Sequence, residues 1–311
     1  MADMAEGKRL GQFNVLLGEG GCMRLALSVA AGVGLWLSAG VPAPALAQSA
    51  GGPDKSQYTV FNPVPADQMR DFSTDRPPKA NSPYTVDAGH FQYETDIVNF
   101  ADQLNGATRG YTLLAPNPTF KEGITNNLDL EVNISLVGVY ASNLATGQSS
   151  TTWGIGDLYT RAKINLWGND GGQSAFALIP YVKAPTAPAG IGNGAVEGGV
   201  IAPLSISLPN DFTFSFNSEL DALKDSADDG RHANYVNLVN LSRPIVKDVT
   251  LYLELWSDYN ADPAQKTTQY SFDTALTWLI RPNLQLDFGA DFGLNSATPT
   301  VQLFAGLSQR F

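Results

Sequence analysis

Apolar and polar residues alternate along most of this chain with a period of two. In residues 300–311, the odd-numbered positions from 301 to 307 are apolar, whereas the even-numbered positions between them are small or polar except for Phe304. Successive side chains of a strand point to opposite faces, so the alternation predicts a sheet with one apolar face and one polar face. The pattern can be followed back to about residue 89.

Twelve segments carry the alternation, although Pro116 and Pro118 interrupt the second and the eighth has no cleanly apolar face. Segments of about ten residues are long enough to cross a bilayer at the usual tilt, whereas strands of soluble sheets average about 5–6 residues. The predicted strands are residues 89–100, 109–120, 126–140, 153–168, 174–185, 196–208, 211–223, 233–244, 248–259, 268–281, 283–294 and 300–311.

The connections between these segments alternate between short and long. A membrane barrel with short periplasmic turns and long outer loops requires such an alternation. We expect turns at 121–123, 169–173, 209–210 and 281–283, and longer loops at 141–152, 186–195, 224–232 and 260–267.

The sequence therefore predicts an all-β fold, a transmembrane, antiparallel, up-and-down β-barrel of about twelve strands over residues 89–311. Closure of the sheet leaves no edge, so every backbone group finds a partner in lipid. An even number of strands places both chain ends on one side of the membrane. The alternative is a soluble periplasmic or secreted β-sandwich, which would turn its charged face toward water.

The N-terminal part of the chain predicts export. Arg24 precedes an apolar stretch over residues 25–37, and Ala-Leu-Ala ends at Ala47. This order is typical of a secretory signal peptide. We expect residues 1–47 to be removed after Ala47, with residues 1–22 as a spurious extension ahead of the true start codon, and the mature protein to reside in the bacterial outer membrane.

Composition excludes several functions. The net charge of −11 argues against nucleic-acid binding, which needs clustered Lys and Arg. Charged residues make up 16% of the chain, below the ~25% of soluble proteins. The one cysteine, Cys22, lies in the expected extension, so no disulfide, cysteine metal site or cysteine nucleophile is expected in the mature protein.

Residues suited to catalysis are scarce. His90 and His232 fall at opposite ends of the predicted barrel, so they are not expected to share a metal or catalytic site. The chain contains no Gly-x-Ser-x-Gly motif of a serine hydrolase. We therefore expect no catalytic residue, no cofactor and no metal site, and the sequence does not predict an enzyme.

The polar face is predicted to line the barrel and to be acidic overall. A fixed ring of acidic side chains would favour cations or neutral solutes. Alternatively, these side chains pair into a structural network that fills the lumen. The residues that we assign to the lumen are Glu131, Arg161, Lys163, Glu219, Glu254 and Asp287.

Two short pieces, residues 72–77 and 82–94, resemble the start of a bacterial family called putative MetA-pathway of phenol degradation. The resemblance implies an outer-membrane barrel that passes aromatic or other small organic compounds. Residues 48–88, which precede the barrel, are expected to form a periplasmic segment that either enters the lumen as a plug or lies along the rim. The residues that carry the resemblance are Asp75, Arg76, Pro77, Ser82, Pro83, Tyr84 and Gly89.

These observations predict a channel for passive uptake of small hydrophobic or aromatic molecules. The alternative is a structural or surface-binding barrel with a closed lumen. Expected partners are outer-membrane lipid, a small organic solute, and the barrel assembly machinery, which would read the C-terminal strand that ends in Phe311.

Overall fold

The computed structural model describes residues 54–311, so the predicted signal peptide lies outside the described residues. One short 3-10 helix, η1 (Ala66–Gln68), precedes fifteen strands, and no helix of the described part is long and apolar enough to cross a membrane. The strands are β1 (Phe91–Asn105), β2 (Thr108–Leu114), β3 (Asn117–Thr125), β4 (Leu128–Asn133), β5 (Leu136–Asn143), β6 (Ser149–Ile155), β7 (Leu158–Trp167), β8 (Ser174–Ala184), β9 (Glu197–Ser207), β10 (Thr213–Lys224), β11 (Arg231–Val246), β12 (Val249–Asn260), β13 (Thr267–Arg281), β14 (Leu284–Gly293) and β15 (Val301–Arg310).

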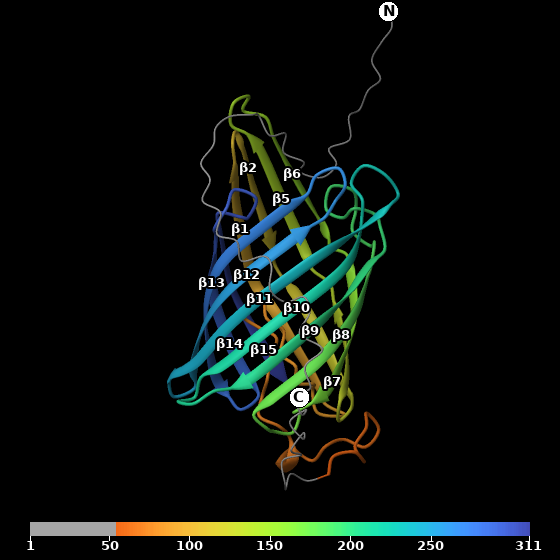
Figure 1. Ribbon diagram of the computed structural model, residues 1–311, viewed down its shortest axis with the longest axis vertical. Coiled ribbons are helices and arrows are strands. Elements are labelled where there is room, and N and C mark those ends of the chain that lie inside the picture. Colours follow the sequence, from red (N-terminus) through yellow and green to blue (C-terminus); the bar gives the residue numbers. More distant parts are fainter. Residues whose placement is uncertain (1–53) are drawn as a thin grey trace, which may run out of the picture.

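The strands form one closed antiparallel sheet, which confirms the predicted barrel (Figure 1). The barrel has twelve strand positions around its circumference, here called walls. Three walls are each built from two consecutive strands, β2 with β3, β4 with β5, and β6 with β7. The sheet closes where β15 pairs with β1, from Gln92 opposite Arg310 to Asp102 opposite Val301.

The three interruptions lie beside one another in the sheet. Leu136 N–H donates to Pro116 O at 2.9 Å, and Gly156 N–H donates to Ser135 O at 2.8 Å. Pro116 lacks the N–H that a regular ladder requires. The irregularity that begins at this proline therefore continues into the two following walls, which the sequence pattern did not reveal.

β6 pairs with β5 on one side only. The loop between β8 and β9 covers its other side: a Cβ placed at Gly154 would lie 2.7 Å from Pro188 Cγ and 2.8 Å from Ile191 Cδ1. A covered edge does not offer its backbone groups to other chains.

The interior of the barrel is polar and the exterior is apolar. Lys163, Glu131 and Glu254 are among the largest fully buried side chains, whereas large apolar side chains such as Leu130 and Phe288 are exposed. A soluble sandwich would bury the opposite face. The alternative of a soluble sandwich is therefore wrong, because the sheet closes on its polar side.

The two ends of the barrel differ. One end holds the C-terminus and the segment around η1, and the longer loops lie at the other end (Figure 1). The end with the C-terminus also carries the short turns at 126–127, 247–248 and 282–283. By the rule for such barrels, the end with short turns is periplasmic.

The turn predicted at 121–123 is wrong, because these residues belong to β3 and the chain turns at 126–127. Tight-turn residues such as Gly123 also occur inside strands, where they admit a close neighbour.

The weak eighth segment is part of β11. Leu238 and Asn240 point inward and are buried, whereas Asn237 points outward. This strand places an apolar residue inside and a polar residue outside, which explains why neither face was cleanly apolar in the sequence.

Candidate functional site

Residues 71–87, here called the inserted segment, enter the lumen from the periplasmic end and return to it. Both ends of the segment are fixed at the same place. Arg70 N–H donates to Asp87 Oδ2 at 3.1 Å, and Arg70 Nη1 donates to Thr85 O at 2.9 Å. Arg310, at the end of β15, donates to the same carboxylate at 3.2 Å. The segment is thus a loop closed at its base.

Arg76 joins the inserted segment to β1 and β14. Its guanidinium donates to Asp96 Oδ1 at 2.7 Å and makes two bonds to Asp287, at 2.7 and 3.1 Å. Paired bonds from one guanidinium to a carboxylate are strong and directional. The absence of a side chain at Gly306 makes room, because a Cβ there would lie 2.2 Å from Arg76 Nη2.

Asp75 points to the other side of the lumen, where it meets two lysines. Lys163 Nζ donates to both carboxylate oxygens at 2.8 Å, and Lys121 donates to Oδ2. The backbone N–H groups of Asp75 and Arg76 donate to Glu94 at 3.0 Å. Burial by itself would raise the pKa of Asp75, but the two lysines more than offset it and hold the pKa below its ordinary value.

Lys79 lies near the tip of the segment and reaches β13 and β14. Its Nζ donates to Asp273 and to Asp291, both at 2.7 Å, and lies 5.2 Å from the ring centre of Trp256. The backbone N–H of Lys79 donates to Glu254 at 3.0 Å. The segment is therefore held on both sides of the lumen by buried ion pairs.

The structure places the six residues assigned to the lumen on inward-facing positions of the walls. Glu254 and Asp287 contact the inserted segment as described above, and so does Lys163. Glu131 lies 3.3 Å from Lys163 and 3.9 Å from Arg161. Glu219 instead lies beside another acidic residue, Asp221, and beside the cation Arg161.

The residues of the family-like motif all lie in or next to the inserted segment. Ser82 N–H donates to Asp75 Oδ1 at 2.7 Å, and Pro83 O accepts from Asn165 at 2.9 Å. Pro77 and Tyr84 are part of the same loop, in which Tyr84 N–H donates to Ser82 Oγ at 3.2 Å.

Gly89 lies next to the segment and has a φ of +75°, and a Cβ there would lie 2.8 Å from Pro63. Only glycine fits the conformation and the space at position 89.

Lys79, which joins the tip of the segment to β13 and β14, was not among the site residues predicted from the sequence. Its partners Asp273 and Asp291 are 194 and 212 residues away in the chain. The only signal was a Lys among prolines at the end of Asp75-Arg76-Pro77-Pro78-Lys79. A charged run in an otherwise Pro-rich stretch next to an acidic barrel face predicts such pairing.

A cavity of about 520 Å³ lies between the base of the inserted segment and the periplasmic end of the barrel. Its lining includes Arg70, Phe72, Tyr84, Asn169 and Arg310. The Arg310 guanidinium lies 5.6 Å from the ring centre of Phe72. Aromatic and polar groups thus meet at the periplasmic end of the lumen.

A closed barrel with an apolar exterior and an internal segment of its own chain defines an outer-membrane β-barrel protein. The chain belongs to the family described as putative MetA-pathway of phenol degradation, whose model matches residues 74–311. The resemblance noted in the sequence is therefore confirmed, and the match begins in the inserted segment.

The fold is similar to that of several solved structures. The COG4313 outer membrane channel from Pseudomonas putida F1 is 16% identical, with a TM-score of 0.53 over 71% of this chain and 94% of that chain. The NanC porin is 14% identical, with a TM-score of 0.46 over 69% of this chain and 98% of its own. The CymD monoaromatic hydrocarbon channel is 9% identical, with a TM-score of 0.40 over 71% and 87%. No curated protein matches the sequence.

Proposed function

We propose that this protein is a channel for passive passage of small hydrophobic or aromatic molecules across the outer membrane, and that the inserted segment is its plug. The observation that carries the proposal is a polar lumen crossed by a segment that is held by ion pairs and hydrogen bonds, with Arg76, Asp75 and Lys79 as the main anchors. Such contacts exchange with water and ions, so the segment is able to leave without unfolding the barrel.

The chemistry of the lumen supports small aromatic solutes. Tyr252 and Trp256 alternate with Glu254 along the inner face of β12, and Tyr181 donates to Asp221 on the inner face of β8 and β10. Aromatic rings offer apolar contact, and their polar atoms bind hydroxyl or carboxyl groups of a solute. The family description, which refers to phenol degradation, agrees with this class of solute.

Planar-bilayer recording tests the plug. The protein without residues 72–84 is compared with the full-length chain, with the double variant Arg76→Ala/Lys79→Ala, and with Lys247→Ala, whose side chain is 92% exposed on a turn. We expect a several-fold larger conductance in the deletion and in the double variant, and none of this increase in Lys247→Ala. The double variant retains the whole segment, so it decides the question if the deletion does not assemble.

Solute passage is measured separately, by flux of phenol and benzoate into vesicles that carry the deletion variant, with glucose as the comparison. Faster entry of the aromatic compounds supports the proposed solute class. Unchanged conductance in both the deletion and the double variant would favour a structural barrel with a closed lumen.

We also propose that the C-terminal strand is the assembly signal and that residues 1–47 direct export. Phe311 N–H donates to Phe91 O at 2.8 Å, and its ring lies 6.1 Å from that of Tyr93, so the last residue is part of the closing seam of the barrel. Removal of Phe311 is expected to reduce the amount of assembled protein in the outer membrane, measured by heat-dependent gel mobility.

A further inference from the structure

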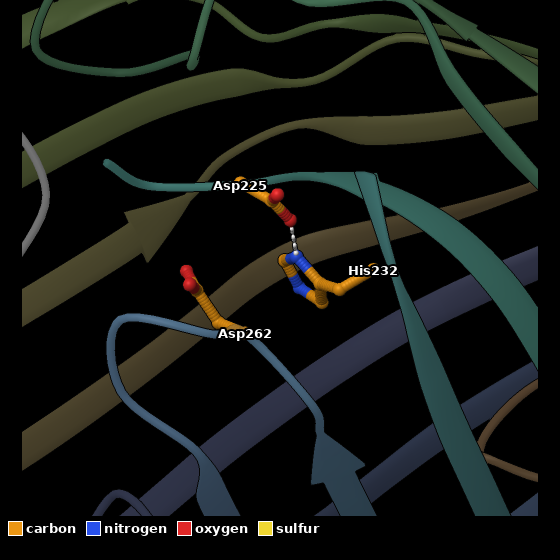
Figure 2. Close-up of side chains that lie close together, drawn as sticks. All are labelled: Asp225, His232 and Asp262. Carbon is orange, nitrogen blue, oxygen red and sulfur yellow. Dashed lines mark hydrogen bonds and ion pairs between the residues drawn. The ribbon is translucent and has the colours of Figure 1, made fainter. Parts of the chain in front are cut away.

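A second polar cluster lies at the opposite end of the barrel from the plug's base. Asp225 directly follows β10, His232 is the second residue of β11, and Asp262 lies in the loop between β12 and β13. Asp225 and His232 face each other across a hydrogen bond, Asp262 lies beside them (Figure 2), and all three are largely buried. One potential ligand atom from each lies within 4.8 Å of the others. The cluster thus connects two neighbouring outer loops.

The cluster buries two carboxylates without a cationic side chain to balance them. Among the ion pairs of residues 54–311, the only partner of Asp225 is His232, and Asp262 has none. The nearest lysine in the sequence, Lys224, pairs instead with Asp229 at 2.8 Å. A positive charge at this place, either a proton on His232 or a bound cation, would offset the cost of burying the two carboxylates together.

The hydrogen bonds of His232 favour the cation. Nδ1 is 2.7 Å from Asp225 Oδ1, whereas Nε2 is buried and has no hydrogen-bond partner. The side chain is only 5% exposed. A protonated ring would carry a hydrogen on Nε2 and leave a buried donor without an acceptor. A neutral ring that donates from Nδ1 to a carboxylate presents a lone pair at Nε2, as metal-binding histidines commonly do.

Asp262 is held in place by the backbone of both loops. Ser226 N–H donates to its Oδ2 at 3.0 Å, and Ala264 N–H donates to its Oδ1 at 2.9 Å. Each carboxylate oxygen retains a further lone pair for a metal. The carboxylate is therefore oriented before any ligand arrives.

We propose that His232 Nε2 and the Asp262 carboxylate bind a divalent transition-metal cation, with zinc as the representative ion, while Asp225 orients the imidazole through its bond to Nδ1. The bound cation would tie the β10–β11 loop to the β12–β13 loop. An imidazole combined with carboxylates suits zinc, whereas calcium and magnesium prefer oxygen ligands alone. Zinc–ligand bonds of about 2.0–2.2 Å require the ligand atoms to approach to roughly 3.4 Å, a small movement for loop side chains. The sequence predicted no metal site, because His90 and His232 fall at opposite ends of the barrel. His232 meets the two aspartates only because the loops after β10 and β12 lie next to each other in the folded barrel.

Zinc binding to the refolded, chelator-treated protein tests the site. Titration with zinc chloride is compared for the wild type, His232→Gln and Asp262→Asn, with His90→Gln and Asp229→Asn as matched controls. We expect one zinc ion per chain in the wild type and both controls, and at least tenfold weaker binding in the two site variants. Calcium and magnesium chloride should bind at least tenfold more weakly than zinc.

Heat-dependent gel mobility shows which variants contain a folded barrel, and His232→Gln decides the outcome if Asp262→Asn does not fold. The proposal is overturned if the wild type binds zinc no more tightly than His232→Gln does. It is also overturned if His90→Gln removes the bound ion, or if calcium binds as tightly as zinc.

Discussion

At the scale of single residues, adjacent positions of one strand face opposite environments. In β4, Leu130 is 48% exposed on the outer surface, whereas Glu131 is fully buried beside Lys163. The sequence predicted this division, because alternation alone assigns the face of each residue. It did not predict the ion partners, because no local pattern links Arg76 to Asp287, 211 residues further along the chain.

Leu130→Arg is predicted to block assembly of the barrel, because a charge on the lipid face costs roughly 2–4 kcal/mol near the midplane. Glu131→Gln, one position further, should assemble, since Lys121 and Lys163 both retain Asp75 as a partner. Folding into vesicles, followed by heat-dependent gel mobility, measures both variants. Equal tolerance of the two substitutions would contradict the assigned faces.

Asp75 gives a prediction about pH. Burial alone would raise the pKa of Asp75, but Lys121 and Lys163 lower it further than burial raises it. The pKa in the folded protein is therefore below the ordinary value of about 3.9. A depressed pKa contributes stability that is present above the ordinary value and is lost as the pH falls toward the folded value. The difference in unfolding free energy between the wild type and Asp75→Asn should therefore be the same at pH 7 and pH 5, and should shrink only below about pH 4. A difference that already disappears at pH 5 would contradict the ion pairs of Asp75.

At the scale of elements, the twelve segments of the sequence correspond to twelve walls, and only their interruptions were hidden. Pro116 marked one break, but the neighbouring breaks at 134–135 and 156–157 depend on pairing across strands. The path of the inserted segment was equally hidden. Prolines and charges in residues 71–87 were consistent with a rim position or a plug, and only contacts across the lumen separate the two.

Gly123 tests the fit between β3 and the end of the inserted segment. A Cβ at this position would lie 2.1 Å from the backbone oxygen of Asp87, which cannot move without displacing the segment. Gly123→Ala should therefore loosen the segment and make the bond after Lys79 accessible to trypsin. Gly106→Asn is the control, since asparagine tolerates its φ of +57° and no atom lies within 4 Å. Trypsin resistance of Gly123→Ala equal to that of the wild type would show that the segment is not seated against β3.

At the scale of the whole molecule, the lumen contains the inserted segment, which is fixed by ion pairs, and a wall that stays acidic beyond it. Glu219, Asp221 and Asp258 are inward-facing groups of this part, with Arg161 as a nearby cation. Fixed acidic groups in a pore attract cations. The fold and its faces could be predicted from the sequence, but the balance of charge could not, because it depends on which wall carboxylates the plug neutralises.

The variant without residues 72–84 is predicted to prefer potassium over chloride, measured as a reversal potential in a potassium chloride gradient. Asp221→Asn in the same background should reduce the preference, because it removes an inward-facing carboxylate whose hydrogen bonds are to Tyr181 and Asn234 and not to the inserted segment. A reversal potential that favours chloride would contradict an acidic lumen.

The central claim is that the sheet closes with its apolar side in lipid and its polar side around the plug, and fluorescence quenching by brominated lipid tests it most directly. Trp278 is 51% exposed on the outer face, whereas Trp256 lies inside beneath Lys79. In vesicles of lipid brominated along the acyl chain, a variant that retains only Trp278 should be strongly quenched, and one that retains only Trp256 should not. Equal quenching of the two, or no quenching of Trp278, would contradict the claim.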